Sequence, residues 1–227
     1  MKRTRAGYRS GVSTPERPGA EAWVPASGTL EELRTAAQDC RGCELYADAT
    51  QAVVGDGPPS APLVLVGEQP GDKEDLAGEP FVGPAGRLLD EALSSAGIAP
   101  ESVFRTNAVK HFRFSGTRGK QRIHKGPSRV HVVACQPWLL AELDLVGPSG
   151  VVLLGATAGQ SVYGASFKVT QSRGQQLEWP SSLAVSAAPR WVVPTVHPSS
   201  VLRSRQRSED MDAFVADLRV AAALLAP

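Results

Sequence analysis

The apolar positions of the chain form two kinds of pattern that alternate along it. Short, mostly apolar runs predict four strands, over residues 62–67, 103–107, 151–155 and 191–196. Apolar residues at helical spacing predict four helices, over residues 85–96, 128–145, 157–163 and 208–225. This alternation predicts an α/β fold, a three-layer α/β/α sandwich around a mainly parallel four-stranded sheet. Pro194 in the last run favours an edge strand or a bulge.

The N-terminal part of the chain has a different composition. Residues 1–28 are rich in Gly, Pro, Ser and Arg and have no apolar period, so we expect a disordered tail. Thr29-Leu30-Glu31-Glu32 has the form of a capping box and predicts a helix to about Asp39. Residues 29–227 can bury a full core, and we expect a single domain there.

The chain shows no sign of a membrane or of export. No apolar run approaches the roughly 20 residues that span a bilayer. The basic N terminus has no apolar segment behind it, so it does not have the form of a secretory signal. We therefore expect a cytoplasmic monomer that does not bind a membrane.

The charge is concentrated in one segment, although the formal net charge is only +1. There is no Asp or Glu between Glu101 and Glu142. The same segment holds eight cations: Arg105, Lys110, Arg113, Arg118, Lys120, Arg122, Lys125 and Arg129. Such clustering is typical of proteins that bind a phosphate backbone. His124 lies among these cations, which suggests nucleic acid beside a reactive side chain.

Polar residues follow three of the four predicted strands. Glu68 and Gln69 follow the first strand, Asn107 ends the second and His197 follows the fourth. In a parallel sheet the carboxyl ends of the strands meet at one edge, where ligands bind. We therefore expect these residues to share one site.

The chemistry of these positions suits the binding of a nucleic-acid base. Glu68 opens a loop stiffened by Gly and Pro, whose glycines allow a ligand close to the backbone, although the loop lacks the ending of a phosphate-binding P-loop. Asn107 could pair with the edge of a base that stacks on Phe81. His197 could stabilise developing negative charge. The Glu68 loop, Asn107 and Phe81 also have ordinary interpretations, as a strand-to-helix connection, a turn Asn and a core Phe.

The serines after His197 are equally open to two interpretations. Ser199 and Ser200 could bind a backbone phosphate, or one of them could cap a short helix.

The cysteines indicate a metal or cluster site. Cys40 and Cys43 form a Cys-x-x-Cys motif, and Cys135 adds a third soft ligand. His111 is the best candidate for the fourth. Three Cys and one His suit zinc as well as iron–sulfur. Cys135 could instead be a small core residue of its helix.

Five segments, in the same order, resemble the iron–sulfur uracil-DNA glycosylases: GEQPGDKEDLAGEPFVGPAGRLLDEAL (67–93), TNAVKHF (106–112), ACQPWL (134–139), LLGATA (153–158) and VHPSSVLR (196–203). The resemblance covers the chain from about Leu30 to its end. Gln69 stands where the family usually has Ala or Gly, and His111 where it has its third cluster cysteine. An insertion at about 112–127 contains Arg122-Ile123-His124.

Together these departures resemble the UdgX type, which excises uracil and stays covalently attached to the DNA. The loop of that type commonly reads Lys-Arg-Arg-Ile-His, and Gln121 replaces one Arg here. We expect this change to weaken a phosphate or loop contact.

The resemblance implies a role for each site residue. It implies a [4Fe–4S] cluster held by Cys40, Cys43, His111 and Cys135. It implies that Phe81 stacks on uracil and Asn107 reads its edge, while His197 stabilises the departing anion and Glu68 acts beside the sugar. We expect further substrate contacts from Gln69, Gly71 and Asp75, and DNA contacts from Lys120, Arg122, Ser199, Ser200 and Arg203.

The predicted reaction is uracil excision from single-stranded DNA or from a flipped-out nucleotide. We expect His124 to capture the sugar C1′, with nearby cations favouring its neutral form and Glu68 accepting its proton. Two alternatives remain open. One is a turnover glycosylase in which His124 only contacts phosphate, and the other is a non-catalytic DNA-binding module with a structural metal.

Overall fold

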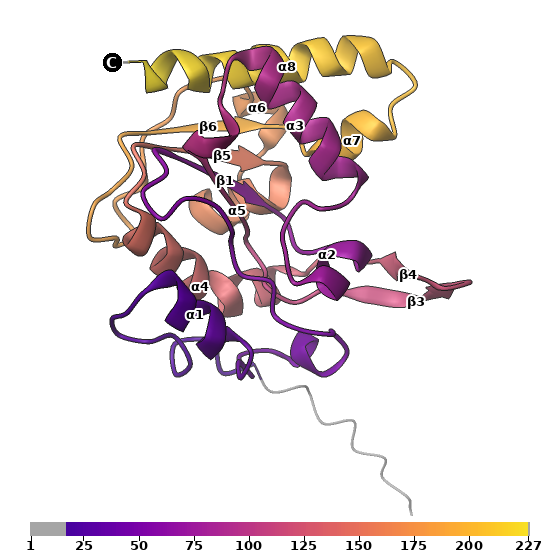
Figure 1. The fold of residues 1–227 in the computed structure, drawn as a ribbon, viewed down its shortest axis with the longest axis vertical. Helices are drawn as coiled ribbons and strands as arrows, with labels where there is room; N and C mark the ends of the chain where they lie inside the picture. The colour runs from indigo at the N-terminus through magenta and orange to yellow at the C-terminus, as the bar shows by residue number, and fades with distance from the viewer. Residues whose placement is uncertain (1–16, 227) are drawn as a thin grey trace, which may run out of the picture.

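The computed structural model describes residues 17–226 and has a four-stranded parallel sheet at its centre (Figure 1). The strands are β1 (Leu63–Gly67), β2 (Val103–Asn107), β5 (Gly150–Leu154) and β6 (Trp191–Thr195), in the order β2-β1-β5-β6. Every residue of β1, β5 and β6 is buried, which explains their continuous apolar runs. β6 is an edge strand of the sheet, one of the two arrangements that Pro194 favoured.

Helices cover both faces of the sheet and confirm the predicted α/β/α sandwich. One face packs against α3 (Pro84–Ala96), α7 (Pro198–Leu202) and α8 (Arg207–Leu225), as Figure 1 shows. The other face packs against α4 (Arg129–Val146) and α5 (Ala156–Tyr163). Alternate strand residues point to the two faces, so Leu65 contacts the first layer and Val66 the second. The short helices are α2 (Asp72–Ala77), α6 (Val169–Ser172), η1 (Glu44–Ala47) and η2 (Pro100–Ser102).

The N-terminal segment corrects one expectation. Residues 1–16 of the predicted tail lie outside the described residues, but residues 17–28 pack against the domain. Ala20 is buried, and the Gly19 N–H donates to the Gly42 carbonyl at 3.1 Å. A Cβ on Gly42 would lie 2.7 Å from the Gly19 oxygen, so the glycine between two cysteines allows this close crossing.

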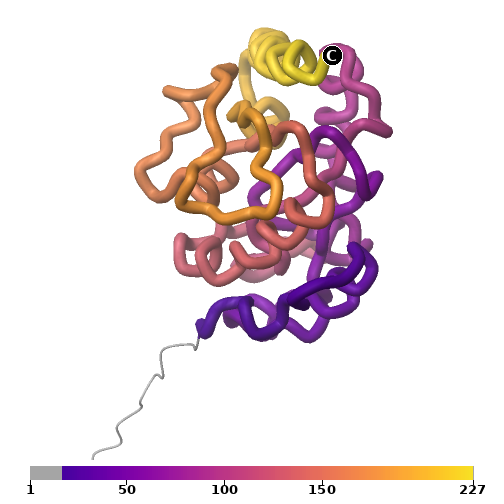
Figure 2. The backbone as a smooth tube through the Cα atoms, turned by 90° about the vertical axis from the view of Figure 1, so that its left-hand side faces the viewer, coloured from indigo at the N-terminus to yellow at the C-terminus, as the bar shows by residue number. Residues whose placement is uncertain are grey.

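The predicted helix after the capping box is α1 (Leu30–Ala37), and both capping-box bonds of Thr29 and Glu32 are present. Together with the N-terminal segment, α1 covers the outer side of α4. Figure 2 shows these residues (indigo) and α8 (yellow) at opposite ends of the molecule. Within residues 17–226, no helix has both the length and the apolar composition to cross a bilayer.

The basic insertion forms an antiparallel hairpin that the sequence pattern did not predict. Its strands are β3 (Phe114–Arg118) and β4 (Gln121–His124). Gly119, with φ +62°, begins the two-residue turn, which requires a left-handed residue at that place. The hairpin projects from the body beside α2 (Figure 1). His124 is therefore the last residue of a strand, at the hairpin base.

Candidate active site

A cleft of about 960 Å³ lies at the carboxyl ends of the strands. All four strand ends contribute to its wall: Glu68 after β1, Asn107 in β2, Gly155 after β5 and His197 after β6. The hairpin closes one side with Arg122, Ile123 and His124. The parallel strands thus bring together the polar groups whose convergence the sequence predicted.

Glu68 and His124 face each other in this cleft. His124 Nε2 lies 3.3 Å from Glu68 Oε1, and the His124 side chain is half exposed. The other carboxylate oxygen, Oε2, accepts a hydrogen bond of 2.5 Å from Thr157. Burial raises the pKa of Glu68, but the bonds from His124 and Thr157 outweigh it and lower that pKa overall. An ionised carboxylate therefore lies beside the imidazole.

His197 is held in a defined tautomer at the N-cap of α7. Its Nδ1 accepts the Ser199 backbone N–H at 3.2 Å and contacts the Ser199 hydroxyl at 2.8 Å. Because burial lowers the pKa of His197 to about 4, the ring is neutral at pH 7 and carries its proton on Nε2. A neutral donor therefore faces the cleft.

Ser199 and Ser200 form hydrogen bonds to His197, within the turn that begins α7. Ser199 contacts Nδ1 of the ring, and the Ser200 hydroxyl donates to the His197 carbonyl at 2.7 Å. These local bonds are close to the capping interpretation. Both serines also line the cleft, so their contacts with phosphate stay a prediction. Arg203 lines the cleft.

Phe81 and Asn107 meet at Gly67. A Cβ on Gly67 would lie 2.3 Å from Asn107 Oδ1 and 2.7 Å from Phe81 Cζ, so only glycine allows both side chains this close. Phe81 has φ +61°, a left-handed conformation that is costly for an aromatic residue. Its ring is nearly parallel to that of His197, at 6.4 Å between centroids. The three groups thus surround one part of the cleft.

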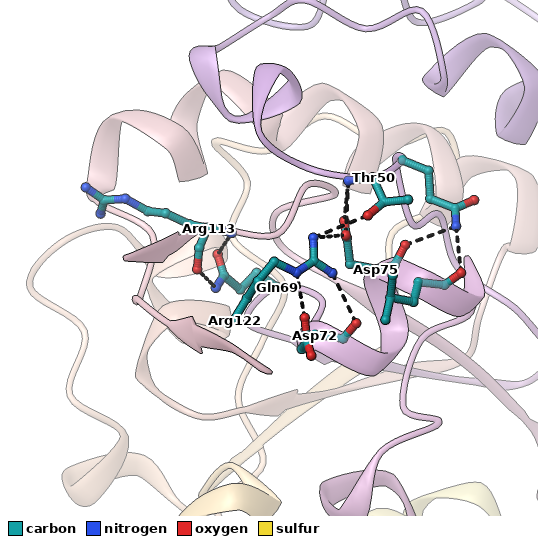
Figure 3. A network of polar contacts seen from close by, with 8 residues as sticks. Thr50, Gln69, Asp72, Asp75, Arg113 and Arg122 are labelled. Atoms are coloured by element: carbon teal, nitrogen blue, oxygen red, sulfur yellow. Dashed lines mark hydrogen bonds and ion pairs between the residues drawn. The ribbon is translucent and has the colours of Figure 1, made fainter. Parts of the chain in front are cut away.

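Gln69 holds the base of the hairpin (Figure 3). Its amide donates to the carbonyls of Arg113 and Lys125, at 3.1 and 3.2 Å, and accepts the Arg113 N–H at 3.1 Å. Gln69 also lines the cleft, with its amide directed at the hairpin backbone, and its contact with substrate stays a prediction.

Arg122 is the second anchor of the hairpin (Figure 3). Its guanidinium pairs with Asp72 at 2.6 Å and Asp75 at 2.7 Å. Asp75 is fully buried and also accepts the Thr50 N–H, so it does not line the cleft. Arg122 lines the cleft, so its predicted contact with DNA stays a prediction, whereas the placement of Asp75 does not match its predicted contact with substrate. Lys120 is exposed at the hairpin turn, and Gly71 lines the cleft as N-cap of α2.

Three residues of the site were missed by the sequence analysis. Thr157 binds Glu68, Asp72 binds Arg122, and the Phe112 ring lies 6.0 Å from the His124 ring. Arg122 also lies over Phe112, at 5.2 Å. For Phe112, the sequence offered one signal of a place in the site: it directly follows His111 and begins the insertion.

Behind the cleft, Lys110 and Glu142 form a fully buried ion pair. Lys110 Nζ donates to Glu142 Oε2, Thr106 Oγ1 and the Asn107 carbonyl, each at 2.7 Å. Glu142 also accepts the Gly55 N–H at 2.8 Å. Every hydrogen on the ammonium has a partner, which a buried charge requires. The pair links the end of β2 to α4.

The three cysteines lie in one buried cluster, apart from the cleft. The Lys110 N–H donates to Cys135 Sγ and the Trp138 indole to Cys40 Sγ, both at 3.2 Å. Burial raises the pKa of Cys135 to about 12 and lowers that of His111 to about 4. Among the described residues, no three His, Cys, Asp or Glu side chains form a group that could hold a metal ion.

The fold and the cleft define an α/β protein with a polar site at the ends of parallel strands, and comparisons with known proteins specify its family. Residues 54–219 match the family described as the uracil DNA glycosylase superfamily. The chain belongs to this superfamily.

Several relatives share the name type-4 uracil-DNA glycosylase. That of Thermotoga maritima is 36% identical over 177 residues, 78% of this chain and 84% of its own. Those of Sulfurisphaera tokodaii and Archaeoglobus fulgidus are 32% and 31% identical, over 77% and 81% of this chain and 76% and 88% of their own.

Proposed function

We propose that the protein excises uracil from DNA and that His124 then captures the sugar C1′ in a stable protein–DNA bond. Membership of the superfamily and the names of the relatives support the excision. The contact between His124 Nε2 and Glu68 Oε1, at 3.3 Å inside the cleft, is the observation that carries the capture.

Excision needs a pocket for an extruded base and a partner for the leaving anion. Phe81 offers a stacking face, and the Asn107 amide can pair with the uracil edge. As the N-glycosidic bond breaks, its electron pair moves to uracil, and His197 can donate from Nε2 to the developing charge. A fixed donor of this kind is often a major contribution to catalysis.

Capture uses the opposite charge, which develops on the sugar. In neutral His124 with its proton on Nε2, the Nδ1 lone pair can form the bond to C1′, and the Nε2 proton moves to Glu68 as this bond forms. The product is a neutral alkylated imidazole. Glu68 holds the proton that the imidazole lost, and the uracil anion takes up one proton after it leaves, so the charges balance. Because an imidazole attached in this way is a poor leaving group, each molecule acts once.

We further propose a [4Fe–4S] cluster on Cys40, Cys43, His111 and Cys135. Each iron of such a cluster takes one protein ligand, so the four ligands need not crowd round one point as those of a single ion do. The buried thiols, their N–H donors and the neutral His111 fit this group. It would join the N-terminal segment, the loop after β2 and α4, and supply stability.

The test is a denaturing gel of the protein mixed with a uracil-containing oligonucleotide and heated in SDS. We expect a shifted band that requires uracil and disappears in His124→Ala, while uracil is still released. The matched variant Val133→Ala, at an exposed position of α4 outside the cleft, keeps the band.

Free uracil and an abasic strand without a shifted band in the wild type would instead establish a turnover glycosylase. Binding without any uracil release would establish a DNA-binding module.

A further inference from the structure

The two oxygens of Glu68 have different partners. Oε1 faces His124 Nε2 at 3.3 Å, while Oε2 accepts a shorter bond of 2.5 Å from the Thr157 hydroxyl. Thr157 lies 89 residues further along the chain, in the first turn of α5. Neither membership of the superfamily nor the proposed capture assigns it a role.

The turn before α5 directs Thr157 toward Glu68. Gly155 has φ +94°, a left-handed conformation that glycine adopts freely, and a Cβ there would lie 3.0 Å from the His197 Cβ. Gly155 therefore lets the chain turn from β5 into α5 directly against the neighbouring strand end. The first turn of a helix also carries free N–H groups and the positive end of the helix dipole, which favour a nearby carboxylate.

We propose that Thr157 is a positioning residue for Glu68, and that its hydroxyl decides how efficiently the sugar is captured by His124 and not by water. This inference rests on the proposed function and deepens it. The terminal torsion of a Glu side chain has a broad energy minimum, so one contact at 3.3 Å leaves the carboxylate free to rotate. A hydroxyl on Oε2 fixes the plane and keeps Oε1 directed at His124.

The hydroxyl also keeps Glu68 able to accept a proton. Burial raises the pKa of Glu68, and the bond from Thr157 is one of the two that lower it. During capture Nδ1 bonds to C1′, the bond from C1′ to uracil breaks with its electron pair on uracil, and the Nε2 proton moves to Oε1. Thr157 keeps its own proton throughout.

Two substitutions separate the hydroxyl from the shape of the side chain. Thr157→Val keeps the branched shape and removes the hydroxyl, whereas Thr157→Ser keeps the hydroxyl and removes a methyl group. Thr35→Val is the control, because Thr35 is an exposed helical threonine whose hydroxyl donates to the Glu31 carbonyl of its own helix. Thermal melting of all four proteins establishes that each is folded.

The readout is the fraction of released uracil that is matched by a covalent band, in single turnover. We expect this fraction and the rate of band formation to fall about tenfold in Thr157→Val, the effect of one lost hydrogen bond to a charged group. Thr157→Ser should stay within about twofold of the wild type, as should Thr35→Val. A wild-type fraction in Thr157→Val, or an equal loss in Thr157→Ser, overturns the inference.

Failure of the proposed capture gives a different result. The wild type then releases uracil without any band, and the same variants are compared by their rate of uracil release. An unchanged rate in Thr157→Val overturns the positioning role, and a slower rate that Thr157→Ser restores supports it.

Discussion

The lack of a side chain at Gly67 determines the shape of the proposed base pocket. Gly67 ends β1, and its Cα faces both the Asn107 amide and the Phe81 ring. Any Cβ there would overlap Asn107 Oδ1 at 2.3 Å and Phe81 Cζ at 2.7 Å. These two groups are held from β2 and from the loop before α3, so an added methyl group must displace at least one of them.

We predict that Gly67→Ala lowers the single-turnover rate of uracil release by about a hundredfold, because displacement of a positioning group by about 1 Å has an effect of this size. Gly97→Ala is the control. Gly97 also has a left-handed φ of +79°, but nothing lies within 4 Å of its added Cβ. It should lower the melting temperature and leave the rate unchanged, and equal rates for the two variants would contradict the prediction.

At the same scale, the sequence indicated the residues at the strand ends but not all of their partners. A cation such as Arg122 can pair with a phosphate or with a carboxylate, and its partners Asp72 and Asp75 lie about 50 residues away in the chain. Likewise Gln69 stood out as unusual, but only the fold shows that it bonds to the hairpin. Such choices depend on tertiary contacts that no local pattern records.

Among the elements, the hairpin is the part that places His124. It is attached at its base by Gln69 and along β4 by Arg122. The rings of Phe112, just before the hairpin, and of Phe114 in β3 have centroids 5.4 Å apart, and the Arg122 guanidinium lies over both. A two-stranded hairpin is only marginally stable alone, so these anchors fix the position of the imidazole.

We predict that Gln69→Ala separates excision from capture. The variant loses the three bonds to Arg113 and Lys125, so the hairpin base moves, whereas Phe81 and His197 are untouched. Covalent yield should fall about tenfold or more, while uracil release stays within about threefold. Gln175→Ala, at an exposed position outside the cleft, should change neither product. Parallel losses of both products would show that Gln69 serves the pocket itself.

The sheet and its main helices could be predicted from the sequence, whereas the hairpin could not. Strands buried on both faces give continuous apolar runs, and the predicted ends of the sheet strands and of α3, α4, α5 and α8 lie within one residue of those observed. In contrast, β3 and β4 are mostly exposed and have no alternating pattern. Their pairing depends on Gly119 and on anchors distant in the chain.

At the scale of the whole molecule, α4 joins the cleft to the cysteine region. Cys135 lies on one part of this helix and Glu142 on another, where it pairs with Lys110 behind Asn107. The N-terminal segment packs on the outside through Ala20. Loss of the proposed cluster should therefore loosen the outer layer before it affects the sheet.

We predict that the proposed cluster makes the protein brown, and that Cys135→Ala abolishes this colour and lowers the iron and sulfide content and the melting temperature. The N-terminal segment should become sensitive to protease first, because its contacts depend on the cysteine region. Val133→Ser, at an exposed position of the same helix, should keep the colour, the iron and the melting temperature. A colourless wild type with stoichiometric zinc would exclude the cluster.

The turn Gly119–Lys120 lies beyond both anchors of the hairpin, and it is exposed. Gly119 has open space around it, with nothing within 4 Å of an added Cβ. Exposed turns with small and polar residues tolerate added chain, because no buried backbone group loses a partner. The hairpin can therefore be lengthened at this turn, and we expect a fluorescent peptide inserted there to leave His124 in its place.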